Sequence, residues 1–476
     1  MQESDPIRVV VRVRPLNETE TSNGNAALVS CASDKRTVSL LQSQAGTGRQ
    51  FEFSACFDES TTQEQFFHHC GVRRLLDSAL DGYSATLFAY GQTGSGKTYT
   101  VSGADLDEGV SITSAHAGVT PRAIKYVFDE AKRRVEREEG LRVSVRASCL
   151  EIYNEQVMDL LNPDSGQLQI RENSGGDGGG FFVENLFVVE CDGVEDACEV
   201  FDEGVKNRRV ASHDLNADSS RSHSIFTLYI DAVRDVQGGA EGTQLTTFGK
   251  VAFVDLAGSE RLKFSKSSGE MVKETGSINK SLFNLGHVIS ALDKGESYIP
   301  YRDSKLTKLL CDSLGGESMT LMIACCSPAS QHVEETTSTL QYASRAKNIK
   351  NKPVIQMDPR ERTILLLRQE VAKLKSENRE LKLKLGMDVS EEEEMEGKEE
   401  GEEEGEEEGK EEGEEEGEEE GEEEGEEEGG GSGIDDKDMT NELVDGVNED
   451  IDVYLDSNLD EEVAAIQKYL SLLRSA

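Results

Sequence analysis

The residues best suited to chemistry lie close together near position 90. The segment Leu87-Phe-Ala-Tyr-Gly-Gln-Thr-Gly-Ser-Gly-Lys-Thr98 contains the pattern G-x-x-x-x-G-K-T. Glycines in such a loop let backbone N–H groups face a phosphate chain, the lysine neutralises the outer phosphates, and the last hydroxyl is suited to Mg²⁺. The pattern predicts a nucleotide-phosphate site made of Gly91, Gln92, Thr93, Gly94, Ser95, Gly96, Lys97 and Thr98.

Two later segments carry other parts of a phosphoryl-transfer site. The apolar run 251–254 ends in Asp255, where a P-loop enzyme needs a carboxylate for Mg²⁺. Gly258 follows, where a small residue lets a backbone N–H approach a γ-phosphate. Residues 216–223, Asn-Ala-Asp-Ser-Ser-Arg-Ser-His, are rich in hydroxyls and suited to closing over a nucleotide. Together these segments predict a nucleoside triphosphatase with two mobile segments.

Apolar patterning predicts the elements that position these segments. Buried strands precede the glycine-rich loop and Asp255, and a helix follows the loop. Further strands are expected at 7–14 and 141–153, and helices at 63–80, from Val119 onward and at 271–292. Residues 104–118 are expected to form an exposed loop over the nucleotide, and the glycines of 174–180 a hairpin tip.

The full set of motifs resembles the motor domain of the kinesin superfamily. In chain order they are R-x-R-P (12–15), GQTGSGKT (91–98), NADSSRSH (216–223), DLAGSE (255–260), NKSL (279–282), YRDSKLT (301–307) and LGG (314–316). A small GTPase or a kinase would not carry SSRSH and DLAGSE together with YRDSKLT. The resemblance covers residues 1–350 and implies an α/β fold, a P-loop NTPase whose central, mostly parallel β-sheet has helices on both faces.

The resemblance implies ATP as the nucleotide and Mg²⁺ as the metal. Thr98 and Ser222 are the implied Mg²⁺ ligands, with Asp255 acting through water, and Lys97 holds the β- and γ-phosphates. The residues implied to border the adenine are Arg12, Arg14, Pro15 and Tyr99. Taken alone, the arginines of this strand would be ordinary solvent-facing residues.

In the family pattern, Arg221 pairs with Glu260 when ATP is bound and closes the site. Glu260 is then the candidate for relaying the proton from the attacking water, with Ser219 helping to position that water. Gly258 and Lys97 complete the implied catalytic set. The alternative reading of Arg221 and Glu260 is a surface ion pair worth less than about 1 kcal/mol.

The family also places the helix at 271–292 and the segment 301–307 against the microtubule. Because tubulin is strongly acidic, cations here are suitable partners with salt-sensitive affinity. The predicted microtubule-binding residues are Lys263, Lys266, Lys273, Arg302, Lys305 and Lys308. The alternative is an ordinary solvated face. Tyr298 departs from the family, which usually has His at that position.

Charge and cysteine content exclude several other classes. The chain has a net charge of −44, of which residues 388–476 contribute −35 and residues 1–387 only −9, so a basic nucleic-acid binder is not indicated. Nine cysteines without paired C-x-x-C spacing do not suggest a disulfide framework or zinc site. His68, His69 and Cys70 are typical of an ordinary helix segment.

The sequence has neither a signal-peptide pattern at its start nor a run of apolar residues long enough to span a membrane. We therefore expect a cytoplasmic protein associated with the microtubule cytoskeleton.

Beyond the motor-like region, four segments are expected. Residues 351–363 resemble a neck linker, which behind an N-terminal motor implies plus-end-directed motion. Residues 364–386 have apolar residues three and four apart, with Asn378 at an a position, and predict a short coiled coil and a homodimer. Residues 387–440 form a Glu/Gly-rich tail expected to be disordered. Residues 441–476 are acidic, with helical spacing near the end that suits a cargo or adaptor, or a helix without a partner.

The acidic tail has two readings. It is either a solvated spacer or a segment that folds back on the basic face of the motor and competes with the track. In the second case, deleting residues 391–430 raises microtubule-stimulated ATPase at low salt, and no change would exclude that reading. Two functions stay open at this point: an ATP-driven microtubule motor, and a nonmotile ATPase that binds microtubules or regulates their ends.

Overall fold

The computed structural model describes residues 5–41, 48–104, 114–172, 180–214, 219–235, 244–260 and 270–358, with scattered positions from 363 to 384. The side chains of 211–214, 219 and 270–279 lie outside the description. The chain divides into two units, residues 1–381 and 382–476, and only Lys384 is described in the second. The predicted tail at 387–440 and the segment 441–476 therefore lie outside the described residues.

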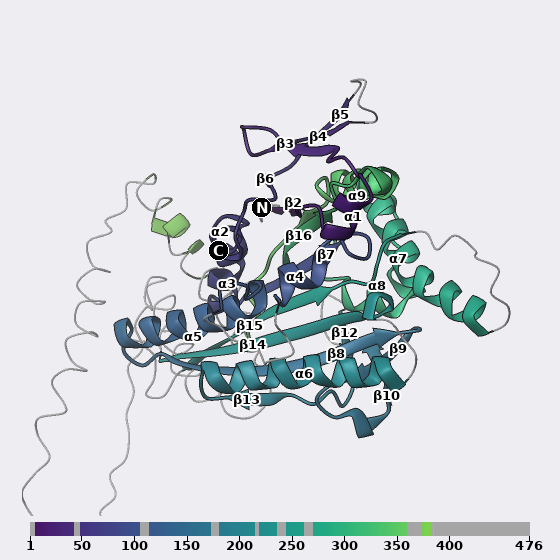
Figure 1. Ribbon diagram of the computed structural model, residues 1–476. Coiled ribbons are helices and arrows are strands. Elements are labelled where there is room, and N and C mark those ends of the chain that lie inside the picture. The colour runs from purple at the N-terminus through teal and green to yellow at the C-terminus, as the bar shows by residue number, and fades with distance from the viewer. Residues whose placement is uncertain are drawn as a thin grey trace, which may run out of the picture. The chain divides into compact units, whose positions relative to one another are not determined.

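Within the described residues, ten strands form one mixed sheet (Figure 1). Their order is β10 (Gln167–Leu168), β9 (Gln156–Asp159), β8 (Arg142–Tyr153), β14 (His223–Asp235), β15 (Gln244–Asp255), β7 (Ser84–Tyr90), β16 (Met319–Cys326), β2 (Arg8–Val13) and β6 (Ala55–Phe57), with β13 (Val189–Cys191) beside β8. Strands β15, β7, β16, β2 and β6 are parallel, and the other pairs are antiparallel. The predicted α/β fold is confirmed, with an antiparallel part that the sequence reading did not anticipate.

Central strands β7 and β16 are buried along their whole length, as parallel strands covered on both faces must be. Alternate residues of β7 point to opposite faces, so Leu87 and Ala89 join one apolar core whereas Phe88 and Tyr90 join the other. The predicted strands at 7–14 and 141–153 are present as β2 and β8.

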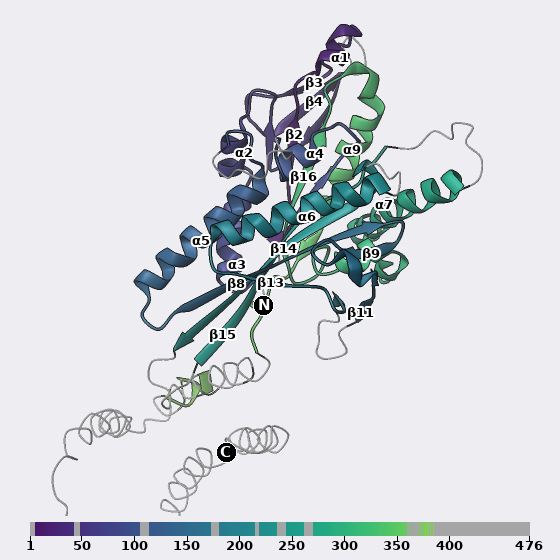
Figure 2. The same ribbon diagram turned by 60° about the horizontal axis from the view of Figure 1, so that its bottom comes forward.

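Helices cover both faces of the sheet. One core is closed by α3 (Val72–Leu80), α5 (Val119–Arg137) and α6 (Val194–Asp214), and Figure 2 shows α5 and α6 on this face. The other is closed by α7 (Glu270–Lys294), α8 (Lys305–Leu309) and α9 (Val333–Ala346). The helices expected from Val119 and at 271–292 are therefore confirmed. None of the described helices is long and apolar enough to cross a membrane.

The helix expected at 63–80 is wrong in one respect, because the chain forms two helices there. Helix α2 (Gln63–His69) ends at Cys70, and α3 starts after Gly71. Gly71 has φ of +100°, a left-handed conformation that interrupts a helix and favours glycine. His68 and His69 lie in the last turn of α2, as the ordinary-helix reading expects.

Besides four short 3₁₀ helices, the described part has several smaller elements. They are α1 (Glu18–Ser22), α4 (Lys97–Val101), a three-stranded sheet of β3 (Val29–Cys31), β4 (Thr37–Leu41) and β5 (Gly48–Glu52), and the pairs β11 (Ile170–Glu172) with β12 (Phe181–Val183) and β1 (Asp5–Pro6) with β17 (Lys350–Asn351). The β11–β12 pair confirms the hairpin expected around 174–180, whose tip at 173–179 is not described. All nine cysteines are free thiols.

The first part of the predicted neck linker lies along the motor domain. Strand β17 pairs with β1, and the backbone N–H of Lys352 donates to the carbonyl of Gly316 at 2.9 Å. Further on, Gln356 donates to the carbonyl of Gly82 and accepts from the N–H of Phe248, both at 2.8 Å. In the predicted coiled coil at 364–386, the described positions are helical, and pairing with a second chain stays a prediction.

Candidate nucleotide site

The glycine-rich loop has the strand-loop-helix setting that the motif predicts. It leaves the buried strand β7 at Tyr90 and enters α4 at Lys97. Gly91 passes close to β16, where a Cβ atom at this position would lie 2.3 Å from the carbonyl oxygen of Cys325. Only glycine fits there, so the packing of β7 on β16 fixes where the loop begins.

Lys97 points back into the loop. Its side chain is buried, and Nζ donates to the carbonyl oxygens of Gly91 at 2.9 Å and Gln92 at 3.0 Å. Burial lowers the pKa of this ammonium group. The buried Oγ of Ser95 and Oε1 of Gln92 have no hydrogen-bond partner within the described part of the chain. A buried cation beside unsatisfied polar atoms suits a charged, polar ligand.

The predicted metal ligands meet at the end of β15. Thr98 Oγ1 donates to Asp255 Oδ2 at 2.7 Å, and the buried Oδ1 of Asp255 has no hydrogen-bond partner among the described residues. Ser222 is also buried and lies near Asp255, because the guanidinium of Arg208 donates to both Ser222 Oγ and Asp255 Oδ2. These oxygen donors fit Mg²⁺, and the unpaired carboxylate oxygen suits a metal-bound water, as expected for Asp255.

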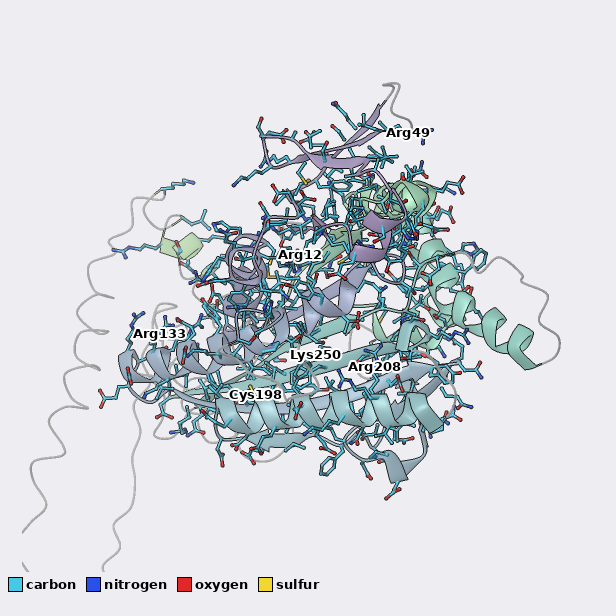
Figure 3. The ribbon with its side chains drawn as sticks, viewed as in Figure 1. Arg12, Arg49, Arg133, Cys198, Arg208 and Lys250 are labelled. Carbon is cyan, nitrogen blue, oxygen red and sulfur yellow. The ribbon has the colours of Figure 1, made fainter. Side chains whose placement is uncertain are left out.

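Arg208, which the sequence reading missed, contacts the predicted metal ligands Asp255 and Ser222. Its side chain extends from α6 toward the sheet (Figure 3). The guanidinium lies 3.2 Å from Asp255 Oδ2 and 3.4 Å from Glu151 Oε1. Nη2 also donates to the carbonyl of Ser222 at 3.1 Å. Arg208 therefore occupies the same oxygens that a cation would use. No motif marks it, because α6 is brought to Asp255 by packing on α5 and on strands β8 and β13.

Residues 258–260, which follow Asp255, are hydrogen-bonded directly to the glycine-rich loop. Glu260 Oε2 accepts from the backbone N–H of Thr93 at 2.8 Å, and its other oxygen accepts from the Thr93 hydroxyl. The N–H of Ser259 donates to the carbonyl of Gly91 at 3.1 Å, and that of Gly258 to the carbonyl of Ser220 at 2.8 Å. The residues after Asp255 thus connect the loop with the segment 219–223.

One of the predicted catalytic residues, Ser219, is only partly defined. Ser219 and Arg221 form a short 3₁₀ helix, and the Ser219 side chain lies outside the description. Glu260 is bonded to Thr93 in this conformation. Its pairing with Arg221 belongs to the ATP-bound state and stays a prediction.

Residues predicted to border the adenine come together at the end of β2. Arg12 is buried, so the reading of this arginine as solvent-facing is wrong; it donates to Gln63 Oε1 at 2.7 Å and lies 5.4 Å from the Tyr99 ring centre. Burial lowers its pKa. Tyr99 and Pro15 are exposed and free to contact a base, whereas Arg14 bonds the loop backbone at Gly94.

Comparison with known proteins agrees with this geometry. The model of the kinesin motor domain family matches residues 12–349. The chain belongs to the kinesin family.

Relatives and a solved structure cover the same region. "Kinesin-like protein KIF12" of Mus musculus is 43% identical over 386 residues, covering 80% of this chain and 58% of that protein. "Kinesin-like protein Klp68D" of Drosophila melanogaster is 40% identical over 372 residues, covering 78% of this chain and 45% of that protein. The solved structure of "a fast kinesin" is 37% identical with a TM-score of 0.66, covering 74% of this chain and 94% of that one. The chain thus spans about half the length of these curated relatives.

On the predicted microtubule side of this kinesin, three of the six cations are described. Arg302 forms an ion pair with Glu172 of β11, and Lys308 Nζ lies 5.8 Å from the ring centre of Phe181 on β12. Lys305 is half-buried, and its backbone N–H donates to Glu155 at 2.9 Å. The other three, Lys263, Lys266 and the side chain of Lys273, lie outside the description.

His223 connects the segment 219–223 with Ala257 after β15 and with α7, a role that the sequence reading did not assign. The N–H of Ala257 donates to its Nδ1 at 3.0 Å, so the ring proton is on Nε2, which donates to Ser281 of α7 at 2.8 Å. Burial, together with the charges of Arg208 and Lys97, lowers its pKa from 6.5 to about 3. The folded protein therefore requires the neutral ring.

The pKa of His223 predicts a loss of stability in weak acid. Because its folded pKa lies below the unfolded value, its contribution is complete above pH 6.5 and declines as the pH falls toward 3. Between pH 7 and pH 5 we expect the free energy of unfolding to drop by about 2 kcal/mol from this ring alone. Denaturant titrations at both pH values measure it. His223→Gln is expected to lack this pH-dependent loss of stability. The control His116→Asn, which replaces an exposed ring, is expected to keep it. An unchanged pH dependence in His223→Gln would contradict the assignment.

Proposed function

We propose that the protein is an ATP-hydrolysing microtubule motor. The observation that carries the proposal is the direct bonding of Glu260 and Ser259 to Thr93 and Gly91 of the phosphate loop. Through these bonds, a change in the contents of the loop alters the position of residues 258–260. A nucleotide-dependent switch needs such a two-state connection between ligand and distant element.

ATP binding relies on the loop and on Lys97. The Lys97 ammonium exchanges its bonds to the carbonyls of Gly91 and Gln92 for bonds to phosphate oxygens, which are stronger because both partners are charged. Thr98, Ser222 and Asp255 are the residues that would hold Mg²⁺, and Arg208 would have to release the oxygens of Ser222 and Asp255 for the metal to bind. When bound, Mg²⁺ neutralises charge that develops on the phosphates.

Hydrolysis requires a positioned water and a proton acceptor. Glu260 leaves Thr93, pairs with Arg221 and relays the proton from the attacking water, with Ser219 helping to position that water. Gly258 brings a backbone N–H toward the γ-phosphate when it releases the carbonyl of Ser220.

Movement depends on the neck linker at 351–363. Hydrogen bonds to Gly316, Gly82 and Phe248 support a docked position for residues up to 356, and a state with those bonds broken is the second position that a linker switch needs. Because this linker follows the motor domain in sequence, we propose plus-end-directed motion. Dimerisation through 364–386, a cargo or adaptor on 441–476 and a location on cytoplasmic microtubules complete the proposal.

A gliding assay tests motility separately from catalysis. With the full chain fixed to glass, polarity-marked microtubules are expected to move in ATP with their minus ends leading. A chain bearing Lys97→Met serves as the matched control without movement. Microtubules that bind and stay still in ATP would instead favour the nonmotile regulator, and movement with plus ends leading would reverse the proposed direction.

A further inference from the structure

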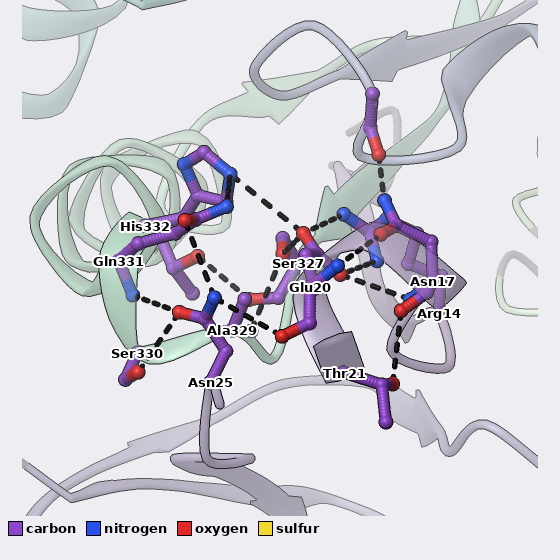
Figure 4. Close-up of polar contacts among 12 residues, drawn as sticks. Arg14, Asn17, Glu20, Thr21, Asn25, Ser327, Ala329, Ser330, Gln331 and His332 are labelled. Atoms are coloured by element: carbon purple, nitrogen blue, oxygen red, sulfur yellow. Dashed lines mark hydrogen bonds and ion pairs between the residues drawn. The ribbon is translucent and has the colours of Figure 1, made fainter. Parts of the chain in front are cut away.

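A buried carboxylate lies beside the phosphate loop without any role assigned so far. Glu20 of α1 has a side chain only 3% exposed. Its two oxygens accept from Arg14 Nη2 at 2.6 Å and Nη1 at 2.7 Å, and Oε2 also accepts from the N–H of Asn17 at 3.0 Å (Figure 4). The Arg14 hydrogen bonds hold the pKa of this carboxyl at about 2, so the pair is ionic at neutral pH.

The helix that carries Glu20 is anchored on the side away from the loop. Asn25 Nδ2 donates to the Glu20 carbonyl at 3.2 Å, and Asn25 Oδ1 accepts from the N–H of Gln331 at 3.0 Å. The Ser327 hydroxyl donates to Glu20 Oε1 at 3.4 Å, and His332 Nε2 lies 3.7 Å from the same oxygen (Figure 4). Glu20 is thus held by the chain between β16 and α9.

Arg14 transmits this position to the phosphate loop. While both Nη atoms are held by Glu20, Nε donates to the carbonyl oxygen of Gly94 at 2.6 Å. A guanidinium is planar and its fork is rigid, so fixing the two Nη atoms also fixes the direction of Nε–H. A lysine at position 14 would keep the charge but lose this geometry.

The bond to Gly94 sets the orientation of one loop peptide. The Gly94–Ser95 peptide is planar and trans, so a carbonyl held toward Arg14 turns the Ser95 N–H to the opposite side. That N–H points across the loop to the carbonyl of Gln92, at 3.2 Å. Gly94 has φ of +74°, a region where glycine rotates at little cost, so the peptide needs an external restraint.

We propose that Glu20 is a positioning residue for the phosphate loop, acting through Arg14 on the Gly94–Ser95 peptide to set the affinity for nucleotide phosphates. The inference rests on the proposed function, because it takes the ligand to be a nucleotide. In this role Arg14 orients the phosphate loop and does not recognise the base. A residue that orients the loop alters the binding of adenine and guanine nucleotides equally, whereas one that contacts the base alters their ratio.

The test compares Glu20→Gln with the wild type in the full chain. The measured quantities are kcat and KM for ATP and the dissociation constants of ADP and GDP, by competition with a fluorescent ADP analogue. We expect KM and both dissociation constants to rise about tenfold, the ADP to GDP ratio to stay constant, and kcat to change less than twofold. Glu18→Gln, at an exposed carboxylate of the same helix, is the matched control and leaves all values unchanged.

A double variant distinguishes positioning from general support of the fold. Arg14→Gln with Glu20→Gln is expected to bind ADP no more weakly than Arg14→Gln alone, because both changes remove one pathway. Additive losses, an altered ADP to GDP ratio, or a wild-type KM in Glu20→Gln would each overturn the inference. If Glu20→Gln fails to fold, Arg14→Lys replaces it with the same expectation. A wild-type chain that binds no nucleotide would refute the proposed function instead.

Discussion

Replacing Glu260 with Ala is expected to lower ATP turnover about 10²–10⁴-fold, the range that proton transfer by a positioned side chain contributes. The carboxylate lies next to the loop, where both oxygens accept from Thr93. ADP affinity is expected to change little, because Lys97 and the loop amides stay intact. Rapid-mixing measurements of a single turnover separate the hydrolysis step from nucleotide binding and product release.

Two further variants sharpen this result. Glu260→Gln keeps the size and the ability to accept from Thr93 but cannot take up a proton, so we expect it to be nearly as slow as Glu260→Ala. Glu59→Ala removes an exposed carboxylate and serves as the control with normal turnover. Hydrolysis within tenfold of wild type in Glu260→Gln would exclude Glu260 as the proton relay.

Replacing Lys97 with Met is expected to weaken ATP and ADP binding by at least about 100-fold, because hydrogen bonds to charged groups contribute about 1.5–3 kcal/mol each. Met has a similar length and no charge, so the loss reports on the ammonium group itself. The fold should tolerate the change, since burial of this cation is unfavourable and an apolar side chain of similar volume fits.

Calorimetric titration with ADP and a thermal melt measure both expectations. The melting temperature of Lys97→Met without nucleotide is expected to equal or exceed that of wild type. Lys132→Met, at an exposed lysine of α5, is the control and binds ADP normally. An ADP affinity within threefold of wild type in Lys97→Met would show that the loop binds phosphate without this cation.

Local patterns predicted the parts of the site that depend on neighbours in sequence. Thr98 follows a buried strand and a glycine-rich loop, and Asp255 ends a second strand, so parallel pairing of β15 with β7 brings the two within 2.7 Å of each other. The sequence could place these residues because strand ends in a parallel sheet meet at one edge.

Residues that act across unrelated elements could not be predicted in the same way. Arg208 reaches Asp255 from α6, and Glu20 is connected to the loop through Arg14. His223 was part of a recognised motif, yet its bonds to Ala257 and Ser281 depend on how α7 packs. Likewise, the long antiparallel pairing of β14 with β15 has no short-range signal that separates it from parallel pairing.

If nucleotide chemistry in this site is coupled to a microtubule, microtubules must accelerate ATP turnover. The decisive measurement is steady-state ATP turnover of the full chain as the microtubule concentration rises at low salt. We expect a strong, saturable increase in kcat that Glu260→Ala abolishes. Turnover that stays constant while the chain binds tightly to microtubules would contradict the motor cycle and leave a tethering or end-regulating protein.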